Sequence, residues 1–331
     1  MGYFNRTKGS IILIHHDTNL VLKLITAFLR LVRWPNLVFI ALTQIMFEYC
    51  IYERVFSNEV ENIGSFYLLV IASVLIAAGG YIINDYFDLD IDQINKPDKV
   101  VVNTLINRRW VIFWHMCISL FGIYFTIFAL HFTEYWHLIL ANMCSVILLW
   151  VYSTSFKKQL LIGNVLISLM TAWVIGILYF SKYPLHNFPS SNYSSNQNVR
   201  FFRLSVLYAG FAFVISLIRE VVKDLEDMEG DRKYGGRTMP IVWGVNASKV
   251  FISVWLIVLI TTLIILQLYV IQLGWWLSIT YCLILIIAPL LYVFKKLFRA
   301  NSTSDYHHLS IIIKMIMFTG IVSMLFFRYY Q

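Results

Sequence analysis

Long apolar stretches constrain the fold of this 331-residue chain more than any other feature of its sequence. A helix needs about 20 apolar residues to cross the hydrocarbon core of a bilayer, and stretches of that order recur from end to end. We therefore predict an all-α polytopic membrane protein of about nine transmembrane helices, forming one domain over residues 1–331 with an N-terminal segment at 1–23. The predicted spans are 24–49, 65–83, 110–130, 135–152, 161–180, 203–222, 249–271, 274–294 and 308–327.

The composition excludes several classes of protein. Hydrophobic residues make up 59% of the chain and charged residues 13%, whereas a soluble globular domain has roughly 25% charged residues. A soluble enzyme, a disordered chain and a nucleic-acid-binding module are therefore excluded. The four cysteines, at positions 50, 117, 144 and 282, stand singly, so the sequence predicts neither a zinc site nor a disulfide framework.

Lys and Arg gather in alternate loops. Twenty of the 26 lie in the stretch up to Arg33 and after the second, fourth, sixth and eighth predicted spans, and five lie in the other loops. Because positive residues stay on the cytoplasmic side, we predict a protein integral to the cytoplasmic (inner) membrane with its N-terminus and these four loops in the cytoplasm. No cleavable signal peptide is expected, since the apolar patch at 11–14 is too short.

Acidic residues are concentrated in two of those predicted cytoplasmic loops. Eleven of the 18 lie there, although orientation alone makes no demand for acids. The first acidic element, residues 84–98, contains Asp85, Asp88, Asp90, Asp92 and Asp98. The second acidic element, residues 219–231, contains Glu220, Asp224, Glu226, Asp227, Glu229 and Asp231.

The spacing within each element indicates a cation site. On a helix, Asn84, Asp88 and Asp92 would share one face, and so would Asp224, Asp227 and Asp231. Carboxylates stacked in this way need a cation or protons between them, and all-oxygen ligands favour Mg²⁺. One such element alone could be a solvated loop, but two with similar spacing predict a diphosphate clamped between metal ions.

Cationic side chains near the acids could hold the remaining phosphate oxygens. Arg219 and Lys223 lie in the second element, whereas Lys157 and Lys158 form a pair that could equally be a topology signal. The small residues 77–80 either let helices approach beneath the metal site or serve ordinary packing. Pro97 and Gly230 are expected to end helices near the two elements.

At these residues the sequence resembles the UbiA superfamily of intramembrane prenyltransferases. The resemblance covers nearly the whole chain and rests on Asn84-Asp85-Tyr86-Phe87-Asp88-Leu89-Asp90-Ile91-Asp92, on Asn95-Lys96-Pro97, on the second acidic element, and on Tyr152-Ser153, Lys157, Gly163 and Asn164. It implies a ring of helices around a central cavity open to lipid, with a cytoplasmic cap over both acidic elements.

The resemblance also implies roles for single residues. Mg²⁺ would be held by Asn84, Asp88, Asp92, Asp224, Asp227 and Asp231, of which Asp88, Asp92, Asp227 and Asp231 would be catalytic. The substrate-binding residues would be Lys157, Lys223, Arg219, Tyr152, Arg33 and Asn36. Arg33 could instead be an interfacial anchor, and Asn36 could simply follow a kink at Pro35. The chain departs from the family pattern Asn-x-Pro-x-Arg-Pro after Pro97, where Asp98 is followed by Lys99 and Val100 in place of the usual Arg-Pro.

Within the superfamily the second acidic element is most similar to the geranylgeranylglycerol-phosphate geranylgeranyltransferase branch. That likeness implies Mg²⁺-dependent prenyl transfer from an isoprenyl diphosphate to a lipophilic acceptor, with geranylgeranylglyceryl phosphate as the expected acceptor. An aromatic quinone precursor is the alternative acceptor. A CDP-alcohol phosphatidyltransferase is disfavoured because 70–83 has no Asp-Gly element, and a cation transporter because the acids lie on one side of the spans. Helices 249–327 are expected only to form the wall of the cavity.

Overall fold

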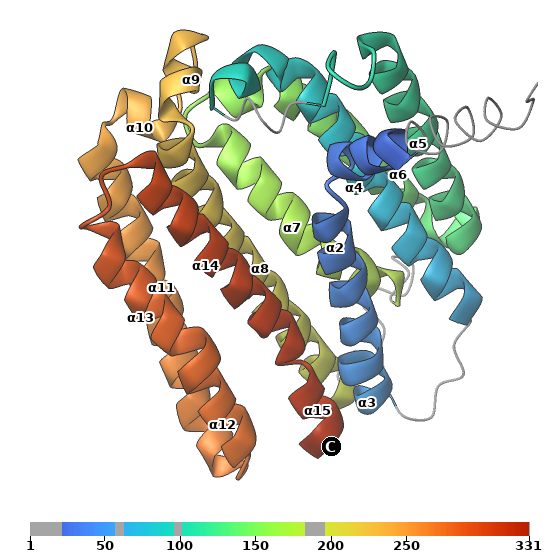
Figure 1. Ribbon diagram of the computed structural model, residues 1–331. Coiled ribbons are helices and arrows are strands. Elements are labelled where there is room, and N and C mark those ends of the chain that lie inside the picture. The colour runs from blue at the N-terminus through green and yellow to red at the C-terminus, as the bar shows by residue number, and fades with distance from the viewer. Residues whose placement is uncertain (1–21, 57–62, 96–100, 183–195, 331) are drawn as a thin grey trace, which may run out of the picture.

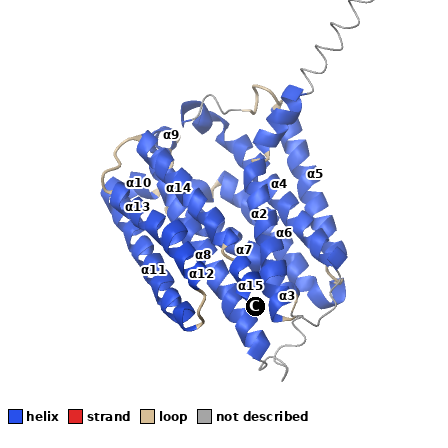
Figure 2. Ribbon diagram, turned by 60° about the horizontal axis from the view of Figure 1, so that its bottom comes forward, coloured by secondary structure: helices blue, strands red, loops and turns tan. Residues whose placement is uncertain are grey.

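The described part of the chain is a bundle of long helices. The structure, a computed structural model, describes residues 22–56, 63–95, 101–182 and 196–330 (Figures 1 and 2). After a helical stretch at 22–31, the helices are α2 (Trp34–Phe47), α3 (Glu53–Val55), α4 (Ile63–Asn95), α5 (Arg108–Ala129), α6 (Phe132–Thr154), α7 (Ile162–Ser181), α8 (Asn196–Glu226), α9 (Met228–Lys233), α10 (Met239–Val242), α11 (Val245–Gln272), α12 (Trp276–Cys282), α13 (Ala288–Leu297), α14 (Thr303–Val322) and α15 (Leu325–Tyr330). In these residues β-structure is limited to one isolated bridge, between Val102 and Ile106.

The number of membrane spans agrees with the sequence prediction. Nine helical segments in the described residues are long and apolar enough to cross a membrane. They are Trp34–Val55, Ile63–Asn95, Arg108–Ala129, Phe132–Thr154, Ile162–Ser181, Asn196–Glu226, Val245–Gln272, Trp276–Leu297 and Thr303–Tyr330. The chain is thus an integral membrane protein whose polar chemistry must be placed at the ends of helices or inside the bundle.

The first span begins ten residues later than predicted. The stretch 22–31 is a separate helix that turns sharply away from α2 (Figure 1). Pro35 cannot donate a backbone hydrogen bond and disfavours helical geometry before it, and Arg33 adopts a left-handed conformation with φ 51°. The separate helix buries Ala27 and Leu31 against α4, so its C-terminal end stays close to the first acidic element.

Two helices extend beyond the predicted spans and carry the acids with them. The first acidic element was expected in a loop after residue 83, but α4 continues without a break to Asn95. At 1.5 Å per residue, its 33 residues reach about 50 Å, well beyond a hydrocarbon core of about 30 Å. Likewise α8 continues past the predicted end at 222 to Glu226. Pro97, Asp98 and Lys99 lie outside the described residues.

Small residues allow α4 to pack closely on α5 and α6. A Cβ atom at Gly80 would lie 2.8 Å from Leu149 of α6, and one at Gly122 of α5 would lie 2.8 Å from the Ile76 side chain and 3.2 Å from its backbone nitrogen. The stretch 77–80 therefore serves helix packing. Farther along the chain, α8, α11, α13 and α14 bury a second set of apolar side chains between them.

The close contact at Gly122 yields a prediction about stability. We expect Gly122→Leu to lower the free energy of unfolding by about 1–3 kcal/mol, because backbone atoms of α4 cannot move aside as a flexible side chain can. The matched control is Gly210→Leu, where an added Cβ meets nothing within 4 Å. The fraction of each variant that stays monodisperse after heating in detergent reports its stability. An equal loss of monodisperse protein in the two variants would contradict this account of the α4–α5 contact.

Candidate active site

The first acidic element presents one face of α4 to the interior. Asn84 and Asp88 are buried, with 7% and 3% of their surface exposed, and Asp92 one turn farther is partly buried. Asn84 donates through Nδ2 to Asp88 Oδ2 at 2.6 Å, while its Oδ1 is buried without a partner in the described chain. Asp90 points to the exposed side of the same helix. The spacing of the three predicted ligands therefore places them on one face, as expected.

Two predicted substrate-binding cations contact this element directly. Lys157, from a 3₁₀ turn at Phe156–Lys158, forms an ion pair with Asp88. Arg33 donates to Asp85 at 2.7 Å, and its guanidinium also lies over the Tyr81 ring. Burial lowers the pKa of Lys157, but its interactions with Asp88, Tyr152 and Asp92 together outweigh this effect and leave the pKa raised. The charge of Asp85 raises the pKa of Arg33. Both side chains therefore remain cationic.

The second acidic element is broken by a bend. Asp224 lies in the last turn of α8, Asp227 lies in the bend with φ −95° and ψ 6°, and Asp231 lies in α9. The three carboxylates therefore do not share one continuous helical face, as their spacing had suggested. Asp231 is buried, and Asp224 accepts a hydrogen bond from Asn164 Nδ2 of α7 at 2.8 Å.

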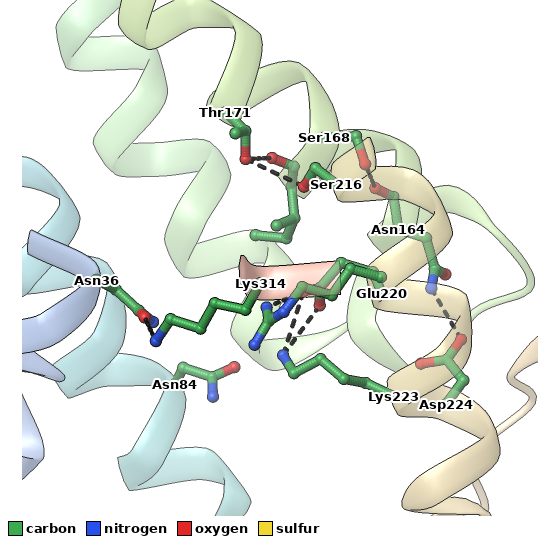
Figure 3. A network of polar contacts seen from close by, with 12 residues as sticks. Asn36, Asn84, Asn164, Ser168, Thr171, Ser216, Glu220, Lys223, Asp224 and Lys314 are labelled. Carbon is green, nitrogen blue, oxygen red and sulfur yellow. Dashed lines mark hydrogen bonds and ion pairs between the residues drawn. The ribbon is translucent and has the colours of Figure 1, made fainter. Parts of the chain in front are cut away.

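Arg219 and Lys223 are paired within their own helix. Both contact Glu220, at 3.3 Å from Arg219 Nη1 and 3.2 Å from Lys223 Nζ. The Lys223 side chain reaches toward the centre of the polar network that Figure 3 shows, between Asn84 and Asp224. Lys223 immediately precedes Asp224, the metal-ligand candidate of α8, and Arg219 lies about one turn earlier, where a phosphate group between the two elements could be contacted.

Asn95 joins the two acidic elements. Its Nδ2 donates to the backbone oxygen of Asp227, and its Oδ1 accepts from the backbone nitrogen of Gly230, both at 3.0 Å. A Cβ at Gly230 would lie 2.5 Å from Asn95 Oδ1, so any side chain at this position would displace the Asn95 amide. Gly230 lies inside α9, and the prediction that it ends a helix was wrong.

Two further predicted substrate-binding residues lie within this region. The Tyr152 hydroxyl interacts electrostatically with Lys157 and with the acids Glu220, Asp88 and Asp224, so it lies between the two elements. Asn36 accepts a hydrogen bond from Lys314 Nζ of α14 at 2.8 Å (Figure 3). Lys158 is exposed, and its backbone oxygen accepts from the backbone nitrogen of Arg237.

Several residues of the site were not predicted with these roles. Asn95, Asn164 and Lys314 all contact predicted site residues from other helices. For Lys314 the sequence did carry a signal, because it is the one Lys or Arg inside the predicted final span. Asn95 and Asn164 were noted as part of the family pattern, but no spacing rule links them to partners more than 50 residues away.

The described side chains could hold a hard cation only together with other ligands. No group of three His, Cys, Asp or Glu side chains within the described ranges is arranged to hold a metal ion alone. The unpartnered Asn84 Oδ1 beside the buried Asp88 carboxylate offers oxygen ligands on one side. Mg²⁺ commonly binds one or two carboxylates and completes its shell with water and substrate phosphates, so this donor set fits that ion.

Comparison with known proteins identifies the family. The sequence model of the UbiA prenyltransferase family matches residues 55–319. The chain is 30% identical over 199 residues to a digeranylgeranylglyceryl phosphate synthase of Methanothermobacter thermautotrophicus, covering 57% of this chain and 61% of that relative. A protein of the same name from Methanosphaera stadtmanae is 28% identical over 256 residues, covering 76% and 83% of the two chains.

Solved structures show the same fold. A digeranylgeranylglyceryl phosphate synthase has a TM-score of 0.57 at 21% identity, covering 91% of this chain and 99% of that one. A UbiA homologue from Archaeoglobus fulgidus, solved with GPP and Mg²⁺, has a TM-score of 0.54 at 17% identity, covering 90% and 99%. With the family's sequence model matching most of the chain, this integral membrane protein belongs to the UbiA prenyltransferase family.

Proposed function

We propose that this prenyltransferase moves the geranylgeranyl group of geranylgeranyl diphosphate onto the free hydroxyl of geranylgeranylglyceryl phosphate, forming a second ether bond. The observation that carries the proposal is the pair of acidic elements held together by Asn95, with cations on both. The choice of acceptor is supported by relatives named digeranylgeranylglyceryl phosphate synthase, one of which matches 76% of this chain. Family membership favours this reaction over cation transport.

The acidic elements are assigned to metal binding. Asn84 Oδ1, Asp88 and Asp92 would hold Mg²⁺ on the α4 side, and Asp224, Asp227 and Asp231 on the side of α8 and α9. When bound, Mg²⁺ supplies positive charge that stabilises the diphosphate as a leaving group. The assignment is supported by the oxygen-only donors and by the homologue from Archaeoglobus fulgidus solved with GPP and Mg²⁺.

The cations of the site are assigned to the diphosphate. Lys157 can exchange its contact with Asp88 for a phosphate oxygen, which frees that carboxylate for the metal. Arg219 and Lys223 provide charge-assisted hydrogen bonds from α8. Together these groups stabilise the negative charge that develops as the bond between the allylic carbon and the diphosphate oxygen breaks.

The proposed reaction breaks one carbon–oxygen bond, forms another and releases one proton. The electron pair of the broken bond leaves with the diphosphate, and the hydroxyl oxygen of the acceptor forms the new bond to the allylic carbon. We assign the departing hydroxyl proton to the oxygen of the Asp92 carboxylate that does not bind Mg²⁺. Asp92 is partly buried and forms no ion pair within the described residues. Catalysis would take place on the cytoplasmic side, because the Lys- and Arg-rich loops are expected there.

The direct test offers one donor and several acceptors. Purified protein in non-ionic detergent receives labelled geranylgeranyl diphosphate with geranylgeranylglyceryl phosphate, 4-hydroxybenzoate or dihydroxynaphthoate, and lipid products are identified by mass. We expect digeranylgeranylglyceryl phosphate with Mg²⁺ and none with EDTA. A prenylated aromatic product would instead assign the aromatic acceptor, and no Mg²⁺-dependent diphosphate release with any acceptor would reject the proposal.

Substitution of Asp88 is the most exacting single test of metal binding. Asp88→Asn keeps the size of the side chain but removes its charge, and we expect turnover to fall at least 100-fold with folded yield retained. Asp90→Asn is the matched control, since it removes the same charge from the exposed side of α4. Initial rates of diphosphate release measure both, and comparable rates in the two variants would remove Asp88 from the metal site.

The Asn95 contacts predict a positioning effect. Asn95→Ala removes both hydrogen bonds to the segment around α9, so we expect kcat to fall at least tenfold and the Mg²⁺ concentration needed for half-maximal rate to rise. Gly230→Ala should act in the same way by displacing Asn95, whereas Gln93→Ala, on an exposed position of α4, should not. An unchanged Mg²⁺ requirement in Asn95→Ala would show that these contacts serve stability alone.

A further inference from the structure

Lys314 is an ionisable residue in the middle of a membrane-spanning helix. It is the twelfth residue of the 20 in α14, in the sequence IIIKMIMF, about 17 Å along the axis from the helix start. A lysine near the centre of a spanning helix is costly to insert into a bilayer and marks a functional position by default. Its side chain reaches away from α14 toward α2 (Figure 3).

The partners of Lys314 are neutral. Its Nζ donates to Asn36 Oδ1 at 2.8 Å and lies 5.3 Å from the centre of the Phe39 ring. No carboxylate of the described chain lies within 4 Å of it. By contrast, every other cation of the site has an acidic partner: Arg33 has Asp85, Lys157 has Asp88, and Arg219 and Lys223 share Glu220.

The surroundings of Lys314 carry excess positive charge. Arg33 and Arg219 are close enough to repel its ammonium group. Asp85 pairs with Arg33, and Glu220 is shared between Arg219 and Lys223, so neither carboxylate compensates Lys314. The Nε atom of Arg219 is also buried without an acceptor in the described chain. A partly buried cation in this setting is stabilised when an anion binds next to it.

We propose that Lys314, oriented by Asn36, binds the phosphate group of the acceptor lipid at an anion site separate from that of the donor diphosphate. The acidic elements lie on α4, α8 and α9, whereas Lys314 and Asn36 lie on α14 and α2, so the two sites adjoin at Arg219 but use different residues. The identity of the ligand as the acceptor rests on the proposed function. The existence of a second anion site does not rest on the proposed function.

Kinetics separates the two substrates. Lys314→Met should raise the KM for geranylgeranylglyceryl phosphate at least tenfold and leave the KM for geranylgeranyl diphosphate within twofold, and Lys314→Arg should restore most of the affinity for the acceptor. Lys296→Met, which removes an exposed lysine of the neighbouring α13, is the matched control. Its KM values for both substrates should equal those of the unmodified protein. A rise confined to the KM of the donor would place Lys314 on the diphosphate and overturn the proposal.

Direct binding tests the site independently of turnover. Calorimetric titration with dodecyl phosphate, in non-ionic detergent and with the donor site filled by geranylgeranyl thiodiphosphate and Mg²⁺, should show binding that weakens at least tenfold in Lys314→Met. Asn36→Asp is the second variant: a carboxylate there pairs with Lys314, preserves the contact between α2 and α14, and should also abolish binding.

The outcomes distinguish the two proposals. Displacement of dodecyl phosphate by the thiodiphosphate, or equal affinity in all variants, would overturn the second anion site. If dodecyl phosphate binds through Lys314 but no digeranylgeranylglyceryl phosphate forms, the proposed function fails while the anion site stands.

Discussion

The two hydrogen bonds of the Asn95 side chain determine the geometry of the whole site. They link the end of α4 to the bend that follows α8, and each acidic element owes its position to one of these two helices. Carboxylates brought together in this way repel one another, so the hydrogen bonds that link the two helix ends must hold them at a fixed distance. The absence of a side chain at Gly230 allows the backbone to approach closely enough for both bonds.

Ion pairs compensate several of the charges in the same region. Lys157 reaches Asp88 from the turn after α6, Arg33 reaches Asp85 from the turn before α2, and Glu220 holds Arg219 and Lys223. Ion pairs of this kind can be exchanged for contacts with a charged ligand at little net cost, because each partner gains a new counter-ion when it gives up the old one. The ion pairs therefore compensate much of the charge of the polar interior when no ligand is bound.

The sequence predicted the features that depend on local pattern. Apolar stretches located nine spans, and the spacing of Asn84, Asp88 and Asp92 placed these residues on one helical face, as the structure shows. It failed where the outcome depends on packing between distant segments. The bend at Asp227 disrupts a regular spacing, and Asn95 meets its partners 132 and 135 residues away. Lys314 was visible as an isolated charge, yet its partner Asn36 lies 278 residues earlier.

The length of α4 has a consequence for an amphiphilic substrate. About 30 Å of this helix suffices to cross the hydrocarbon layer, so the turns that carry Asp88 and Asp92 extend toward the headgroup region. A prenyl diphosphate has the same two parts, because its hydrocarbon tail prefers lipid and its diphosphate head prefers water. Such a substrate can therefore diffuse laterally along the bilayer and meet the acidic residues at the depth where its own head already resides, without being extracted from the membrane.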